Sequence, residues 1–251
     1  MVNISTVIIT NNSADIIEKT VKAVQWCDEI IIVDSGSTDD TVGICAKLGC
    51  KTYSRDFTGY GEQKNHAASL AKNDWILSID ADEVVSEELK SEIQAIFKTG
   101  EIGYAGFSLP ITLVFCGRVF KHCENSKPHL RLYNKKFASF NLSKVHEKVV
   151  IEGKTRVLKN EILHYSFRNI SNYIQKMDIY TSKGAEDLFE NKKKFSNFFL
   201  FIRFPFDFFK FYFIRGCIFE GFPGFIWAML SSFYPMVKYF KLYEIRRLEE
   251  K

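Results

Sequence analysis

The sequence lacks an apolar run long enough to cross a membrane as a single helix. Its longest stretch without a charged residue, Gly221 to Val237, has 17 residues and contains two prolines, whereas a spanning helix needs about 20 apolar residues. A basic leader is also missing, because residues 1–10 contain no Lys or Arg and run directly into an apparent strand. We therefore expect a cytoplasmic protein.

The cysteines form no CxxC pair, the spacing that often marks a metal or redox site. Several lie in apolar stretches, where a free thiol packs as a small hydrophobic side chain. His122 lies between Cys116 and Cys123, but this spacing matches no usual zinc ligand set and the fourth ligand is missing. The pattern predicts free thiols in a reducing compartment for all six cysteines, Cys27, Cys45, Cys50, Cys116, Cys123 and Cys217.

A compact block of Lys and Arg, typical of nucleic-acid binding, is absent too. The net charge of +4 arises at the C-terminal end, where eleven Lys or Arg and five Asp or Glu occur from residue 192 onward. These cations are interleaved with aromatic residues, since fifteen of the 24 Phe lie between Phe195 and Phe240. Such a mixture is typical of a segment that lies on an anionic membrane surface. We predict this contact and no nucleic-acid partner.

The change in composition predicts two parts, a main α/β domain over residues 1–190 and a helical, Phe-rich region over residues 191–251. In our first interpretation, the helices of the second part lie on the membrane. Two alternatives remain open. The region forms a homo-oligomer through a pair of hydrophobic helices, or it packs on the main domain.

Along the first 100 residues, β-branched runs alternate with helical patterns. The expected strands are residues 5–10, 29–33, 51–54 and 75–79. Apolar residues at spacings of three and four predict helices over 14–24, 38–48, 61–71 and 86–97. Shorter strands are expected beyond Tyr104. The alternation predicts a doubly wound sheet, whose ligands bind beyond the carboxyl ends of its strands.

Two carboxylates, Asp80 and Asp82, follow the fourth expected strand. Two carboxylates together with substrate phosphates are the usual way to hold Mg²⁺ or Mn²⁺, because these hard cations prefer oxygen ligands and retain several waters. The metal would offset the charge that develops on a leaving diphosphate. The alternative is an acidic, solvated turn at a strand end.

A second polar cluster, Asp34 to Asp39, follows the second expected strand. It offers a carboxylate able to bond a base or a ribose, followed by a turn of small residues that leads into a helix. The alternative is a helix N-cap with an Asx turn, which uses the same residue types.

The chain resembles the family 2 glycosyltransferases in the order of its motifs, which are VIIT, DEIIIVDSGSTDDT, GYGEQKNHA, DWILSIDADEVVSEEL, LRLYNKKF and VHEKV. Within that family it is similar to the branch that includes lipopolysaccharide core glucosyltransferases. The resemblance covers most of residues 1–185. It implies a GT-A fold with a mixed sheet and a metal-dependent, inverting hexosyl transfer from a nucleotide-diphosphate donor, with a UDP-sugar favoured.

The resemblance also implies roles for particular residues. Asp34 would contact the nucleoside, and Thr10 and Asn12 would border the base. Asp80 would lie near the ribose and the metal, and Asp82 would ligate the metal.

Three further residues lie in matching motifs. Lys64 would contact the diphosphate or the base, although the family more often has Arg there and Lys lacks the bidentate fork. Glu147 is the first choice as general base, ahead of Asp178 and Glu83. His146 would orient Glu147 or contact the metal or diphosphate.

Arg131 alternates with the apolar neighbours Leu130 and Leu132, so it would point into the cleft toward phosphate or acceptor, or else pair with a structural carboxylate. For Lys64 the alternative is a solvated helix lysine, and for His146 and Glu147 it is two ordinary surface residues.

Three hypotheses about function follow. The first is a peripheral enzyme of cell-envelope synthesis at the cytoplasmic face of the inner membrane, acting on a lipid-linked saccharide such as the lipopolysaccharide core. The second keeps the reaction type but transfers to polyprenyl phosphate or to a protein side chain. The third is a nucleotide-binding membrane scaffold that has lost catalysis, which the retained carboxylates disfavour.

Overall fold

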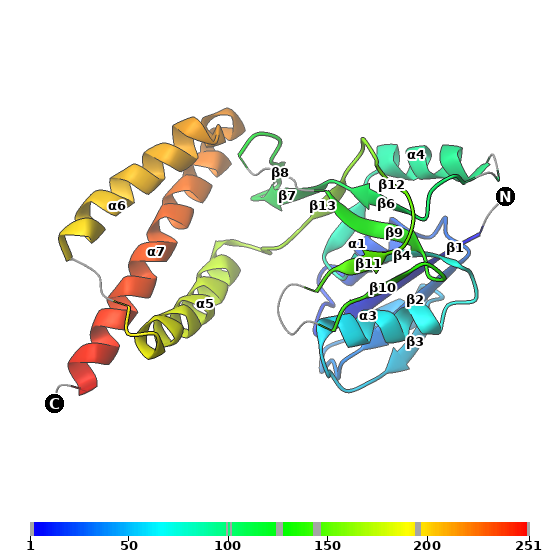
Figure 1. The fold of residues 1–251 in the computed structure, drawn as a ribbon, viewed down its shortest axis with the longest axis horizontal. Coiled ribbons are helices and arrows are strands. Elements are labelled where there is room, and N and C mark those ends of the chain that lie inside the picture. The colour runs from blue at the N-terminus through cyan, green and yellow to red at the C-terminus, as the bar shows by residue number, and fades with distance from the viewer. Residues whose placement is uncertain are drawn as a thin grey trace. The chain divides into compact units, whose positions relative to one another are not determined.

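The structure, a computed structural model, describes residues 3–98, 100, 102–123, 128–142, 147–193 and 197–249. It contains two compact units (Figure 1). The first unit comprises residues 1–111 and 126–164, and the second comprises residues 112–125 and 165–251.

The main sheet of the first unit consists of β1 (Ile4–Thr10), β2 (Glu29–Asp34), β3 (Lys51–Ser54), β4 (Trp75–Asp80), β6 (Gly106–Leu109), β9 (His129–Asn134) and β12 (Thr155–Val157). The strand order is β12-β6-β9-β4-β1-β2-β3. β1 pairs in parallel with β2 and β4, β2 pairs in parallel with β3, and β9 runs antiparallel to both β4 and β6. The predicted doubly wound, mixed sheet is confirmed.

Both faces of this sheet are buried, as the unbroken apolar runs predict. The connecting helices are α1 (Ile17–Lys22), α2 (Thr41–Lys47), α3 (Tyr60–Ser69) and α4 (Glu87–Lys98). Neighbouring residues of β1 enter different cores: Ile8 packs with residues of α1, α2 and α4, whereas Val7 packs with residues of α3. Because side chains alternate along a strand, this arrangement leaves the strand ends as the place for polar side chains.

Two short antiparallel pairs complete the first unit. β5 (Glu83–Val85) pairs with β13 (Ile162–His164), which places His164 opposite Glu83. β10 (Ala138–Phe140) pairs with β11 (Val149–Ile151). The second pair is attached to α3, because the Asn65 amide donates to the Phe140 carbonyl at 2.8 Å and accepts from the Phe140 N–H at 2.8 Å.

The second unit is built from β7 (Ile111–Phe115) apart from its first residue, β8 (Arg118–Val119), α5 (Ile170–Glu190), α6 (Asn197–Phe209), a π-helical turn η1 (Lys210–Ile214), a 3₁₀ turn η2 (Cys217–Glu220) and α7 (Gly221–Glu249). Its core is aromatic. The Trp227 ring on α7 lies 5.1 Å from the ring of Phe115 and 5.6 Å from that of Tyr173, in near-perpendicular geometries that aromatic rings favour.

The chain passes between the two units after residues 111, 125 and 164, whereas the predicted boundary lies after residue 190. The aromatic core explains this difference. Tyr173 and Met177 of α5 are buried in the same cluster as Trp227, so α5 belongs with the helical unit. Phe115 and Phe120 join that cluster from a segment more than 50 residues earlier in the chain. Composition marks where Phe becomes frequent, but it does not show which earlier segments pack against the Phe-rich helices.

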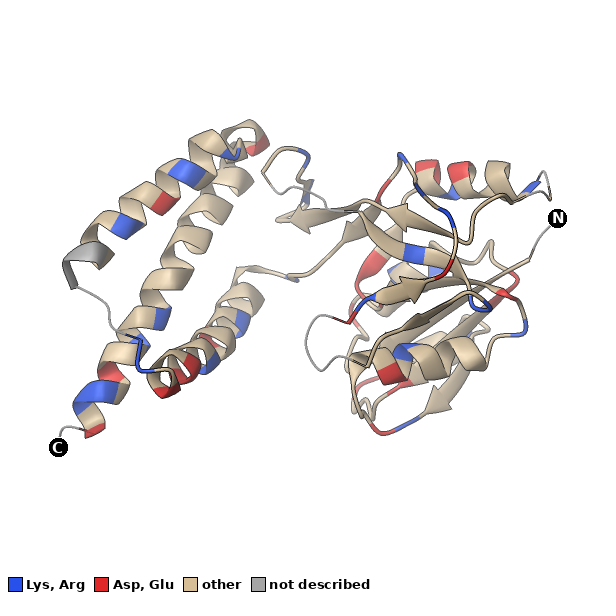
Figure 2. Ribbon diagram, viewed as in Figure 1, with Lys and Arg blue, Asp and Glu red and all other residues tan. Residues whose placement is uncertain are grey.

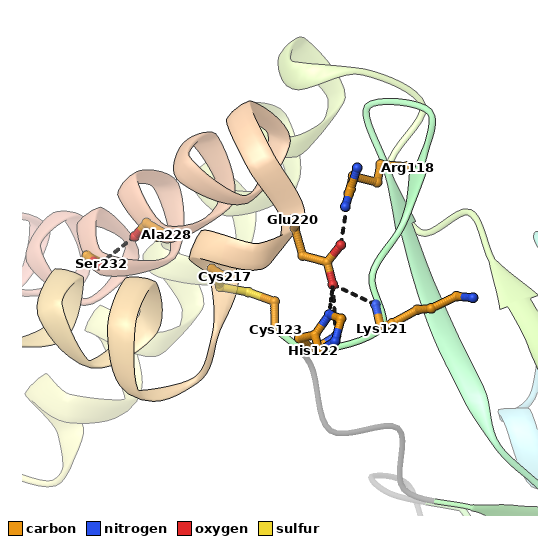
Figure 3. Close-up of a disulfide and its surroundings, with 8 residues drawn as sticks. All are labelled: Arg118, Lys121, His122, Cys123, Cys217, Glu220, Ala228 and Ser232. Atoms are coloured by element: carbon orange, nitrogen blue, oxygen red, sulfur yellow. Dashed lines mark hydrogen bonds and ion pairs between the residues drawn. A yellow bond between two sulfur atoms is a disulfide. The ribbon is translucent and has the colours of Figure 1, made fainter.

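The second unit also contains a disulfide between Cys123 and Cys217, which are 94 positions apart (Figure 3). The prediction that all six cysteines are free thiols is therefore wrong for this pair. Cys27, Cys45, Cys50 and Cys116 are free. Sequence spacing could not reveal the pair, because only the aromatic core brings the two segments together.

Beside the disulfide, the buried carboxylate of Glu220 attaches the segment after β8 to η2 (Figure 3). Its Oε1 accepts the backbone N–H groups of Lys121 at 2.7 Å and His122 at 2.8 Å, and its Oε2 accepts Nε of Arg118 at 2.9 Å. Burial alone would raise the pKa of Glu220, but the hydrogen bonds from Arg118, His122 and Lys121 outweigh burial and lower it.

Glu220→Gln is expected to lower the free energy of unfolding at neutral pH by about 2 kcal/mol, because hydrogen bonds to a charged group are lost. Since the folded pKa is lowered, the contribution of the charge is present above the ordinary value of 4.5 and is lost as pH falls below it. Thermal unfolding of both proteins between pH 7 and pH 3.5 should show the gap closing. Glu87→Gln, at a side chain that is 77% exposed, is the control, and a gap independent of pH would contradict the assignment.

Among the described helices, none is by itself long and apolar enough to cross a bilayer. Two consecutive helical segments are long and apolar enough only when taken together. They are Leu200–Ile214 and Cys217–Glu249, and they meet at a bend of 67°.

Candidate active site at the carboxyl edge of the sheet

The carboxyl ends of β1, β2 and β4 lie side by side at one edge of the main sheet. Thr10 is in register with Asp34, and Ile9 is in register with Asp80. The parallel pairing therefore brings together the polar clusters that the sequence places after three different strands. This edge is where ligands bind in open α/β sheets.

Asp34 organises the turn that follows β2. Its Oδ2 accepts the N–H groups of Gly36 at 2.9 Å and Ser37 at 2.8 Å, and the Ser37 hydroxyl donates to Oδ1 at 2.5 Å. Asn12 braces the same turn, because its Oδ1 accepts the Thr38 N–H at 2.8 Å. The Asx-turn geometry is present, and nucleoside contacts by Asp34 and Asn12 stay predictions.

Thr10 is buried, with 5% of its surface exposed, and its hydroxyl has no hydrogen-bond partner within the described ranges. Its carbonyl accepts the Ser35 N–H at 2.9 Å. Thr10 thus supports the turn through its backbone, and its contact with a base stays a prediction.

Lys64 on α3 is a buried cation between two carboxylates. Its side chain is 4% exposed, and Nζ lies 2.9 Å from Oδ1 of Asp80 and 3.2 Å from Oε1 of Glu147. The alternative interpretation as a solvated helix lysine is therefore wrong. Lys64 therefore connects Asp80, at the end of β4, to Glu147, which lies two residues before the start of β11.

Arg131 on β9 lies on the other side of Asp80. One of its terminal nitrogens is 2.9 Å from Oδ2 of Asp80 and 2.5 Å from Oε1 of Glu83. Burial opposes ionisation of Asp80, but Arg131 and Lys64 outweigh it and hold the pKa of this carboxyl well below its usual range. Arg131 was predicted either to point toward phosphate or acceptor or to pair with a structural carboxylate, and the structure shows the second arrangement.

Glu83 is the residue whose position the sequence does not reveal. Its side chain is 1% exposed, and besides accepting from Arg131 it accepts the Asp80 N–H on Oε2 at 2.9 Å. Burial, with repulsion from Asp80, raises the pKa of Glu83 in spite of the nearby Arg131. A carboxylate with both oxygens occupied inside the protein is poorly placed to take a proton from an acceptor, so Glu83 is a positioning residue.

Asp82 pairs with His164, whose Nε2 lies 3.3 Å from Oδ1 of Asp82. Burial opposes the imidazolium, but the hydrogen bond and charge of Asp82 outweigh burial and raise the pKa of His164. The β5–β13 pairing creates this contact between residues that are 82 positions apart in the chain. No spacing rule could have found it.

These donors fit a divalent cation. Both oxygens of Asp80 already face cations, whereas Asp82 has a single imidazole beside it and a side chain that is 31% exposed. Over the part of the chain that the structure describes, no three His, Cys, Asp or Glu side chains converge on one point. A cation at Asp82 would therefore complete its shell with donor phosphates and water, as Mg²⁺ commonly does.

Of the remaining predicted residues, Glu147 is half-buried, with 21% of its side chain exposed. His146 lies outside the described residues, so its predicted role stays a prediction. The structure thus joins Lys64, Asp80, Arg131 and Glu147 in one chain of ion pairs.

Comparison with known proteins shows the family to which the chain belongs. Residues 5–167 match the sequence profile of the family described as glycosyl transferase family 2, and the chain belongs to that family. It is a glycosyltransferase with a GT-A-like fold.

The chain is 39% identical over 263 residues to a protein of Rickettsia felis described as an uncharacterized glycosyltransferase, covering 97% of this chain and 90% of that one. It is 28% identical over 255 residues to the lipopolysaccharide core biosynthesis glycosyltransferase LpsC of Rhizobium meliloti, covering 98% and 94%. A crystal structure of S. aureus TarS is similar in fold, with a TM-score of 0.50, 17% identity, and coverage of 72% of this chain and 39% of that one.

Proposed function

We propose that this glycosyltransferase moves a sugar from a nucleotide-diphosphate donor to a lipid-linked saccharide such as the lipopolysaccharide core. A UDP-sugar is the favoured donor. The observation that carries the proposal is the arrangement at the carboxyl edge of the sheet, where Asp82 with His164 stands beside the ion-paired Asp80. Similarity to LpsC supports the acceptor class.

Asp82 would hold Mg²⁺ or Mn²⁺, which would offset the negative charge of the departing diphosphate, and His164 would hold the Asp82 carboxylate in place. Lys64 and Arg131 hold the Asp80 carboxylate still from two sides, so it is ordered before the donor arrives. A preorganised charge of this kind costs no reorganisation when the reaction occurs. The Asp34 turn follows β2, which is separated from β4 by β1, and the nucleoside would bind at this turn.

For an inverting transfer, Glu147 would take the proton of the acceptor hydroxyl as that hydroxyl attacks the anomeric carbon. Lys64 holds one carboxylate oxygen of Glu147 at 3.2 Å, and the other oxygen would accept the proton. The same ammonium therefore orders a donor-side carboxylate and the candidate base. Transfer to polyprenyl phosphate or to a protein side chain is the alternative and uses the same site.

Calorimetric titration with UDP, UDP-glucose and GDP-linked sugars, with and without Mn²⁺, tests the proposal. We expect one nucleotide class to bind, at least about tenfold more tightly with Mn²⁺, because the metal joins the diphosphate to Asp82. Asp82→Asn should lose the metal-dependent part. Glu18→Gln, at an exposed ion pair on α1, should retain it. Absence of binding by every nucleotide would favour an inactive scaffold.

A further inference from the structure

One helix of the second unit has an apolar side that stays largely exposed in the part of that unit that the structure describes. Ile202, Phe206, Phe209 and Phe213 recur at spacings of four, three and four along α6 and η1, and each is at least 49% exposed. The ring centroids of Phe209 and Phe213 are 5.0 Å apart, so the residues form a continuous stripe. We call these four residues the outer stripe.

The opposite side of α6 is already used. Phe204 packs against Phe233 of α7 with ring centroids 6.5 Å apart, and Phe208 packs against Phe225 at 5.8 Å. Positions two apart on a helix point in different directions, so packing on α7 turns Phe206 outward. Contiguous exposed apolar side chains of this size mark an interaction surface.

Three of the four charged residues between positions 197 and 219 are positive, and Figure 2 shows both signs along this segment. Arg203 and Lys210 are seven positions apart and flank the stripe on the same side, and exposed Arg215 follows η1. Asp207 is the only acidic residue between positions 197 and 219, and it is paired with Arg203 at 3.1 Å. Lys210 and Arg215 therefore remain to attract an anionic surface.

From these observations we infer that α6 and η1 lie in the plane of an anionic lipid surface, with the outer stripe in the acyl boundary and Lys210 and Arg215 at the lipid phosphates. A helix with Phe on one side and Lys or Arg beside it binds in this way through buried apolar area and headgroup attraction. This inference concerns the second unit alone and does not depend on the donor or acceptor.

A second copy of the chain fits this surface less well than lipid does. A two-fold contact would place the same patch on both subunits, so Lys210 and Arg215 of one copy would approach those of the other. Like charges brought together at an interface oppose association. Over the described residues of α6 and η1 the one carboxylate, Asp207, is already paired with Arg203 and so does not compensate them.

Flotation of the full chain with phosphatidylglycerol vesicles tests the inference, with phosphatidylcholine vesicles as the neutral reference. The double variant Phe206→Glu and Phe209→Glu should reduce partitioning at least about tenfold, since two Phe side chains can no longer enter lipid. A matched control is Ile179→Glu with Tyr180→Glu on α5, where the side chains are 53% and 56% exposed against 61% and 54% in the test pair. The control should bind as the unchanged chain does.

The double variant Lys210→Glu and Arg215→Glu tests the contribution of charge, because it leaves the apolar side chains intact. It should weaken binding to phosphatidylglycerol and abolish the preference over phosphatidylcholine. Unchanged vesicle binding by both test variants would overturn the inference. A second result would also overturn it: the unchanged chain does not bind vesicles and is a dimer by light scattering, and the Phe206→Glu, Phe209→Glu variant is a monomer.

Discussion

Asp82→Asn should reduce turnover by about 100-fold or more at saturating donor and Mn²⁺, since the charge compensation that a metal supplies is worth several kcal/mol. The substitution keeps the size of the side chain and an oxygen that can accept from His164. The fold should therefore be retained. Steady-state kinetics over a range of Mn²⁺ concentrations measure the loss of turnover, and circular dichroism checks the fold.

The control for Asp82→Asn is His164→Gln, which removes the imidazole but leaves the carboxylate in place. If Asp82 is the principal ligand, His164→Gln should weaken the apparent Mn²⁺ affinity by about 10- to 100-fold, as changes near a metal ligand usually do, while excess Mn²⁺ restores turnover. Full activity of Asp82→Asn would remove this residue from the proposed metal site.

Local patterns were sufficient to predict the sheet. β1, β2 and β4 begin and end within one residue of the expected strands, because β-branched runs bounded by polar residues leave few alternatives. The rule that ligands bind at the carboxyl ends of such strands then placed Asp34, Asp80 and Asp82 at one edge. The predicted nearness of these residues follows from topology alone.

Contacts between distant segments were beyond prediction from the sequence. Glu83 could have been a base or a surface residue until β9 brought Arg131 against it, and His164 had no assignable role until β13 paired with β5. Lys64 looked equally compatible with solvent because nothing in its helix shows that Glu147 comes from 83 positions away to meet it. In each case the partner lies on an element whose position only the fold determines.

Glu83→Ala should lower the free energy of unfolding of the first unit by about 3 kcal/mol, because it removes one partner from a buried ion pair and leaves Arg131 with Asp80 alone. Glu83→Gln should cost less, since its amide oxygen can still accept the Asp80 N–H. Denaturant unfolding of the full chain, followed by circular dichroism, measures both losses.

If Glu83 acts through Arg131, the two residues must be coupled energetically. Arg131→Met alone leaves Glu83 buried and unpaired, and the combination of Arg131→Met with Glu83→Gln removes both charges from the same volume. Replacing a whole buried pair is often close to neutral, so the double variant should be more stable than the sum of the single losses predicts, by about 1–3 kcal/mol. Strictly additive losses would show that Glu83 stabilises the site independently of Arg131.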